Sequence, residues 1–234
     1  MGSLSLEKVD HLLWLGRYVE RCYTTMGFLI HAYDEALDFP DGAWREQLGE
    51  LGFDATNGAD PIPFFRDSLF NGQNPSSVKF SMSAAFDNAV VLRDVIGTEC
   101  LAYVQMAVNS IEAADRSDSP LLSMQNVRDD ILAFKGCVDE YIGSDTARNL
   151  VKSGFTVERM DLYTRLRYRL ERLQQEAHRL AGRIDRIGIA YDKEAFNKTI
   201  QLVYSPGFPD DFTRERQGEL LTALAALFPE RSLS

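Results

Sequence analysis

The stretch from Leu6 to Asp38 constrains the fold of this chain most strongly, because an apolar stripe with helical spacing runs through it without interruption. Apolar residues at intervals of three and four are typical of one face of an amphipathic helix. Gly16 lies on this stripe, so we expect another helix to approach the backbone closely there. The stripe consists of Val9, Leu12, Gly16, Val19, Tyr23, Met26, Ile30, Tyr33 and Leu37.

Capping signals predict three more long helices. Asn74-Pro75-Ser76-Ser77 is expected to begin one, with Asn74 as the N-cap and Pro75 as the first helical residue. Ser119-Pro120 repeats this signal for a helix that runs to about Ile142. A third is predicted from Thr156 to Gly188, after a short helix that ends at Gly154.

Shorter helices complete the predicted fold, and we find no segment with the alternation of a strand. They are expected at 44–51, 63–70, 192–204 and 212–228. Short connections favour antiparallel neighbours. The sequence therefore predicts an all-α protein, an up-and-down bundle of long amphipathic helices with additional short helices, in a single domain that spans 1–234.

The net charge of −10 argues against a general nucleic-acid or anionic-membrane partner, because such partners attract clustered cations. The stretch 157–188 differs, with eight arginines against five acidic residues, which favours a partner-helix or ion-pair face. Three widely spaced cysteines are typical of a reducing compartment. With no signal-peptide pattern and no membrane-length apolar run, we expect a cytoplasmic protein.

One acidic residue stands where the pattern calls for an apolar one. The stripe after Asn74 continues through Ala89, Leu92 and Ile96 and then reaches Glu99. Burying a carboxylate is costly unless it is paired and hydrogen-bonded. Glu99 is therefore the best catalytic candidate, poised for acid-base work if it is desolvated.

Charged and polar residues near the helical stripes form the candidate site. Arg17, Glu20, Arg21, Asn88, Glu99, Arg167 and Arg172 could converge where the long helices cross. Arginine-carboxylate pairs are strong and directional, so the cluster is either an ion-pair network that fixes helix register or a grip for a carboxylate, amide or peptide end. A faint repeat at a shift of 151 residues aligns Glu20-Arg21 with Glu171-Arg172.

The usual signatures of cofactor chemistry are missing from the sequence. We find no glycine-rich phosphate loop and no nucleophile elbow. The three histidines lack the Glu-x-x-His spacing of di-iron bundles. We therefore expect neither a metal site nor a cofactor.

Four segments together resemble the bacterial alpha-E domain family. They are Leu15-Gly16-Arg17-Tyr18-Val19-Glu20-Arg21, Asn74-Pro75-Ser76-Ser77, Asp87-Asn88-Ala89 with Arg93 and Glu99, and Leu170-Glu171-Arg172. The resemblance covers nearly the whole chain and adds Asn74, Ser76, Ser77 and Arg93 to the candidate binding residues. The chain departs from the family pattern at Leu166-Arg167-Tyr168-Arg169, where a second Leu-Gly-Arg-Tyr-like segment would carry glycine.

The resemblance implies an all-helical fold. It also implies partners, a circularly permuted ATP-grasp ligase and a transglutaminase-like peptidase, and a role in the synthesis and trimming of peptide or amide bonds. The protein would then be a helical accessory that handles the peptide or the ligase. The alternative is a small enzyme or ligand-binding protein that uses the Glu/Arg cluster on a peptide or amino acid. The sequence leaves a homo-oligomer open.

Overall fold

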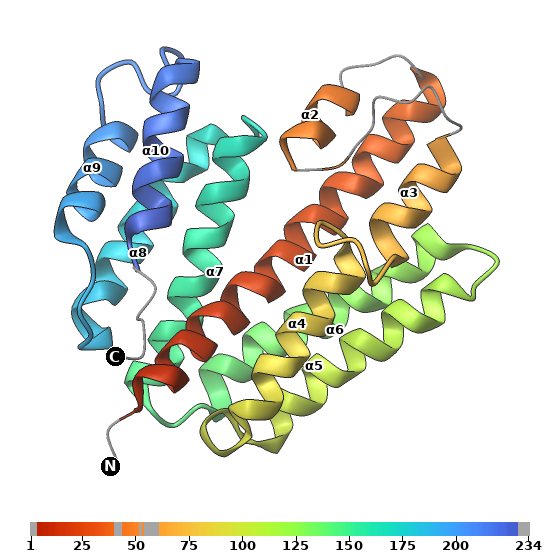
Figure 1. Cartoon of the computed structure of the whole chain (residues 1–234), viewed down its shortest axis with the longest axis horizontal. Helices are drawn as coiled ribbons and strands as arrows, with labels where there is room; N and C mark the ends of the chain where they lie inside the picture. The colour runs from red at the N-terminus through yellow and green to blue at the C-terminus, as the bar shows by residue number, and fades with distance from the viewer. Residues whose placement is uncertain (1–3, 40–43, 52, 54–60, 229–234) are drawn as a thin grey trace.

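The computed structural model describes residues 4–39, 44–51, 53 and 61–228, and the regular structure in these ranges is helical, as predicted (Figure 1). In chain order the elements are α1 (Leu6–Asp38), α2 (Trp44–Glu50), α3 (Pro61–Phe70), α4 (Val78–Val91), α5 (Arg93–Asp115), α6 (Pro120–Tyr141), α7 (Asp145–Arg165), the 3-10 turn η1 (Leu170–Arg172), α8 (Leu173–Ile187), α9 (Lys193–Val203) and α10 (Arg214–Ala226).

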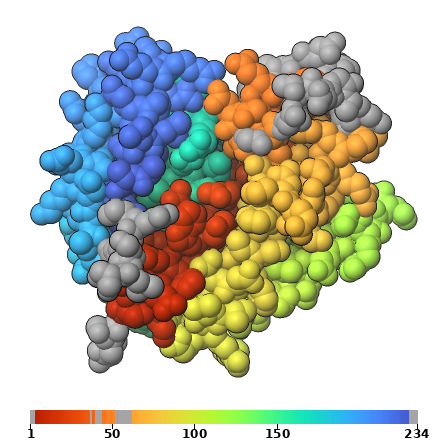
Figure 2. Space-filling view, viewed as in Figure 1, coloured from red at the N-terminus to blue at the C-terminus, as the bar shows by residue number. Residues whose placement is uncertain are grey.

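Helix α1 lies at the centre of the bundle and packs against α2, α3, α4, α6 and α7. Helix α4 runs opposite to α1, and from α4 to α10 successive helices alternate in direction (Figure 1). Helices α1 and α7 therefore run in the same direction where they cross. The helices α8, α9 and α10 cover one side of α7, and the α5/α6 pair lies on the opposite side of the bundle. In Figure 2 the surface of α1 is a strip between the C-terminal helices and α4.

The predicted bounds of α1 are confirmed. Ser5 caps the helix by accepting a hydrogen bond from the Lys8 amide, at 3.3 Å. The stripe positions from Val9 to Met26 are buried, apart from the half-buried Tyr23, and Ile30 and Tyr33 pack against the core. The Leu37 side chain lies outside the described part of the chain.

Gly16 permits the close helix approach that its place on the stripe predicts, and its partner is Gly154 of α7. A Cβ built on Gly154 would lie 3.0 Å from the Gly16 Cα, and one built on Gly16 would collide with the Val151 carbonyl. Gly154 was expected to end a short helix, and that prediction is wrong. The glycine lies inside the continuous α7 because it is a packing position.

The prediction of one long helix that begins at Asn74 is wrong, both in where the helix starts and in its continuity. Ser77 is the N-cap, and its hydroxyl accepts from the Phe80 amide at 3.0 Å. The path then breaks at Leu92 and at Gly97, whose φ of 80° is left-handed. Beyond Gly97 the buried positions are Cys100, Val104, Ala107, Ile111 and Ala114, and Glu99 is exposed. The buried stripe continues from Ile96 to Cys100 at a spacing of four residues, which leaves Glu99 on the exposed side of α5.

The predicted helix from Thr156 to Gly188 is also two helices. The break comes at Arg167 and Arg169, both with positive φ, and tertiary contacts hold it. Arg167 donates to the Phe212 carbonyl at 2.6 Å, and the Tyr168 ring meets the edges of Phe28 and Tyr163. The helix does end where predicted, at Gly188 in a left-handed C-cap.

Within the described ranges, we find no helix that combines the length and the apolar character needed to cross a membrane.

Gly16→Ala should destabilise the protein, because the new methyl group would meet the backbone of α7 rather than a movable side chain. We expect the free energy of unfolding to fall by about 1–3 kcal/mol, the usual range for overpacking. Urea unfolding measures the loss. The matched control is Gly136→Ala in α6, where an added Cβ has nothing within 4 Å and should be neutral or stabilising. Equal stability of both variants would contradict the close crossing.

Candidate functional site

The α1–α7 crossing brings two Glu-Arg dipeptides into reciprocal contact. Glu20-Arg21 follows Gly16 on α1, and Glu158-Arg159 follows Gly154 on α7 at the same spacing. Each arginine donates to the glutamate of the other helix rather than to its own neighbour. Corresponding positions are 138 residues apart, from 16 to 154 and from 20 to 158. The crossing is therefore a local pseudo-two-fold.

Glu20 forms the more enclosed half of this arrangement and is fully buried. Arg159 grips its carboxylate with two hydrogen bonds, from Nε at 2.8 Å and from Nη2 at 2.7 Å. Lys135 of α6 donates to the same carboxylate at 2.7 Å, and Thr24 donates at 3.1 Å. Arg159 also extends Nη1 to Glu176 of α8, at 3.1 Å. Every nitrogen of the Arg159 guanidinium therefore has a carboxylate partner.

The ionisation of this half follows from burial and from the paired cations. Burial pushes the pKa of Glu20 up, but Lys135 and Arg159 outweigh it, so that the pKa lies below its ordinary value. Burial lowers the pKa of Lys135, and Glu20 offsets part of that effect. The pKa of Arg159 is raised, because its two carboxylates outweigh its burial. Glu20 is therefore a carboxylate at neutral pH, held in place rather than poised to exchange a proton.

Glu158 forms the second half and is equally buried, but its arginines bind it differently. Arg17 donates from Nε at 2.8 Å and Arg21 from Nε at 2.6 Å, one to each oxygen. The Arg17 guanidinium also lies over the Trp14 ring at 4.7 Å, and that of Arg21 lies over Tyr18 at 5.4 Å. Within the described residues the Nη groups of these two arginines have no hydrogen-bond acceptor.

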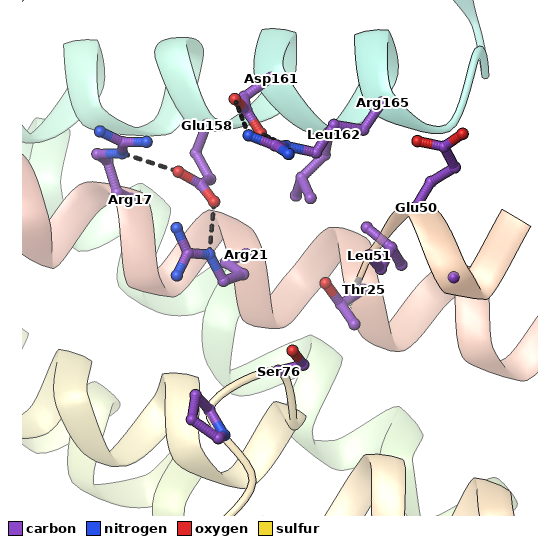
Figure 3. A pocket seen from close by; sticks show the side chains of 12 residues that line it. Arg17, Arg21, Thr25, Glu50, Leu51, Ser76, Glu158, Asp161, Leu162 and Arg165 are labelled. Carbon is purple, nitrogen blue, oxygen red and sulfur yellow. Dashed lines mark hydrogen bonds and ion pairs between the residues drawn. The ribbon is translucent and has the colours of Figure 1, made fainter. Parts of the chain in front are cut away.

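Arg17 and Arg21 both line an open cavity of about 350 Å³, whose lining side chains are drawn in Figure 3. Its walls come from α1, α7, the end of α2 and the segment before α4. Arg165 crosses one side and binds Asp161 through Nε at 2.5 Å and Nη2 at 3.2 Å. The lining residues are Arg17, Arg21, Thr25, Gly49, Glu50, Leu51, Pro75, Ser76, Glu158, Asp161, Leu162 and Arg165.

The crossing gathers three of the residues that the sequence selected, and the cavity adds a fourth. Arg17, Glu20 and Arg21 lie at the crossing, and Ser76 faces Arg21 from the opposite wall. The neighbouring Asn74 shapes this wall, since its Oδ1 accepts from the Ser76 amide at 3.0 Å. Ser77 serves as the cap of α4.

The other selected residues do not join this cluster, and the predicted convergence is wrong for them. Asn88 binds His11 at 2.7 Å, and Arg167 binds the Phe212 carbonyl. Arg93 is exposed at the start of α5, Glu99 is exposed beyond Gly97, and Arg172 is exposed in η1. The repeat that aligned Glu20-Arg21 with Glu171-Arg172 does not describe the packing.

Sequence reasoning missed the α7 half of the cluster, although a signal for it was present. The segment Val157-Glu158-Arg159 repeats Val19-Glu20-Arg21, with a glycine four residues before each glutamate. Lys135 and Glu176 carry no comparable signal, because the packing of α6 and α8 brings them to the cluster.

The fold and the cluster define a class of protein: an all-helical domain organised around paired Glu-Arg dipeptides. A family model described as "a predicted alpha-helical domain with a conserved ER motif", named Alpha-E, matches residues 8–190. This chain belongs to the Alpha-E family. No curated protein and no solved structure matches it. Two of the three Glu-Arg dipeptides in the matched range are those that pair at the crossing.

Glu20→Gln should be strongly destabilising, because it leaves Arg159 and Lys135 buried beside a neutral amide. The expected loss is about 3–5 kcal/mol, as for other broken buried ion pairs. Chemical denaturation measures it. Glu99→Gln is the matched control on an exposed position and should lie within about 0.5 kcal/mol of the parent. A Glu20 variant as stable as this control would contradict the structural role of the pair.

The stability gap between the parent and Glu20→Gln should depend on pH. Since the folded-state pKa of Glu20 lies below the ordinary value of a glutamate, its contribution is fully present above that ordinary value. The contribution is lost as the pH falls through the lower folded-state value. Thermal melts of both proteins in an acid series should therefore converge as the pH falls. A constant gap down to the acid transition would show that Glu20 is not ionised in the folded state.

Proposed function

We propose that this protein is a helical accessory of a bacterial amide-bond synthesis system, in which it holds a peptide while a separate ATP-grasp ligase does the ATP-dependent chemistry. The observation that carries the proposal is the open cavity lined by Arg17 and Arg21, whose Nη groups have no acceptor among the described residues. The sequence resemblance to alpha-E domains beside ATP-grasp and transglutaminase-like proteins suggests the partners.

The geometry favours binding over catalysis. Glu20 and Glu158 are each engaged by cations on both oxygens, and this holds them as structural anions. Guanidinium edges are well suited to hold planar anions by paired hydrogen bonds. Glu99, the candidate for an enzymatic role, is exposed on α5 and does not line the cavity. No observation favours an enzyme built on it.

A basic corner next to the cavity is a suitable docking surface for the ligase. We define this corner as Arg165, Arg167, Arg169 and Arg172, all exposed, around the turn between α7 and α8. Exposed cations that face an acidic partner raise the association rate and orient the complex. Arg165 belongs to both the corner and the cavity, so a ligase docked here would reach a peptide held in the cavity.

Charge reversal at the corner should abolish co-purification with a circularly permuted ATP-grasp ligase from the same genome. The variant is Arg169→Glu with Arg172→Glu, because neither side chain lines the cavity or pairs with a carboxylate in the described structure. The control is Arg93→Glu with Arg186→Glu, which makes the same charge change at exposed positions elsewhere. Loss of the ligase with the corner variant alone supports the proposal. Failure of the parent protein to retain the ligase would overturn it.

A further inference from the structure

We propose that the cavity binds a carboxylate, the C-terminus of a peptide, and that this group takes the place on Arg21 that Glu176 occupies on Arg159. The inference deepens the proposed function, since it names the group by which the peptide would be held. It rests on a comparison within the molecule, between the enclosed half of the pseudo-two-fold and the open half.

The two halves are alike in outline, although Arg159 binds Glu20 through Nε and Nη2 while Arg21 binds Glu158 through Nε alone. Each buried glutamate has two cations, Arg159 and Lys135 on Glu20, and Arg21 and Arg17 on Glu158. In the enclosed half, Nη1 of the arginine continues to Glu176. In the open half the described residues supply no such acceptor, and Arg21 borders the cavity. A carboxylate from a ligand would therefore fill, on the Arg21 guanidinium, the position that Glu176 fills on Arg159.

The arginines are held in a geometry that favours binding. The Nε bonds to Glu158 and the contacts with Trp14 and Tyr18 fix both guanidinium planes. Arg21 is about a quarter exposed, which leaves its outer edge open to a ligand. Because the side chains are already ordered, little conformational entropy remains to be lost on binding.

The charge of the cavity fits one carboxylate. The described lining carries Arg17, Arg21 and Arg165 against Glu50, Glu158 and Asp161, and one positive charge remains when Glu50 is counted together with its own partner, Arg214. Glu50 at the rim is paired with Arg214 at 2.9 Å, outside the cavity. A monoanion would neutralise the site, whereas a phosphate dianion would leave it negative. Burial lowers the pKa of Arg21, but Glu158 outweighs it with a smaller contribution from Asp161, so that the pKa is raised; the Asp161 oxygens themselves accept from Arg165.

The remaining walls indicate what accompanies the carboxylate. Leu51, Pro75 and Leu162 give the cavity an apolar side next to the arginines. Its volume is at the small end of ligand sites, which suits one or two residues. The matching ligand is therefore a peptide that ends in an apolar residue with a free C-terminus.

Isothermal titration of the full-length protein with acetyl-Leu-Leu as the free acid tests the proposal. We expect binding with a Kd of about 1 mM or tighter, and binding at least tenfold weaker for the C-terminal amide. A phosphopeptide with an amidated end and inorganic phosphate distinguish a phosphate site. Equal binding of acid and amide, preference for phosphate, or no binding of the acid would each overturn the carboxylate assignment.

Two variants locate the site. Arg21→Lys keeps a cation for Glu158 but removes the planar fork, and it should weaken binding of the acid at least tenfold, with Arg93→Lys as the neutral control. Gly49→Phe fills the cavity from α2, where an added Cβ meets nothing within 4 Å. It should abolish binding without lowering the melting temperature. Full binding by Gly49→Phe would overturn this location.

The test of the carboxylate site can fail independently of the test of the proposed function. Co-purification of the ligase depends on the basic corner, and titration of the peptide depends on the cavity. A protein that retains the ligase but ignores the free acid would disprove the carboxylate site alone. A protein that binds the free acid but retains no ligase would disprove the partner proposal alone.

Discussion

The close contact of Gly16 with Gly154 is the constraint on which the rest of the structure depends. Because neither glycine has a side chain, α1 and α7 approach closely enough at these two positions for the arginine of each helix to reach the glutamate of the other. Because these pairs are buried, both partners must be present and in place, since a buried charge without its partner costs several kcal/mol. The pairs therefore fix the register of the two helices, and the other helices pack around them, with α6 contributing Lys135 and α8 contributing Glu176.

The two halves of the crossing differ in one respect that bears on function. Around Glu20 the nitrogens Nε, Nη1 and Nη2 of Arg159 and the Lys135 ammonium all donate to carboxylates of the protein, as expected for a structural network. Around Glu158 the Nη groups of the arginines have no acceptor in the described part of the chain, and both arginines line a cavity with α2 and the segment before α4. The repeated motif thus has a structural copy and an open copy. This asymmetry, rather than any single residue, is the basis of the proposed binding role.

The sequence predicted the helical class, the bounds of α1 and the close approach at Gly16, because an unbroken apolar stripe records burial directly. It failed where tertiary contacts decide. From Ile96 a step of three residues leads to Glu99 and a step of four leads to Cys100, and both steps suit a helix; in the structure Cys100 is buried and Glu99 is exposed. The turn at Arg167 and Arg169 is held by distant partners such as Phe212, without a local proline or glycine. For the site, Arg17, Glu20 and Arg21 were predictable, whereas Lys135 and Glu176 depend on packing.

The central claim is that the Glu-Arg dipeptides pair across the crossing, and double-mutant cycles test it most directly. In one cycle Glu20 and Arg159 are each replaced by glutamine, and in a second cycle Glu158 and Arg21 are. Each cycle should show a coupling energy of about 1–3 kcal/mol in urea unfolding. The cycle of Glu20 with Arg21, neighbours in sequence that share no hydrogen bond, should show much less. Coupling within the dipeptide and none across the helices would contradict the account.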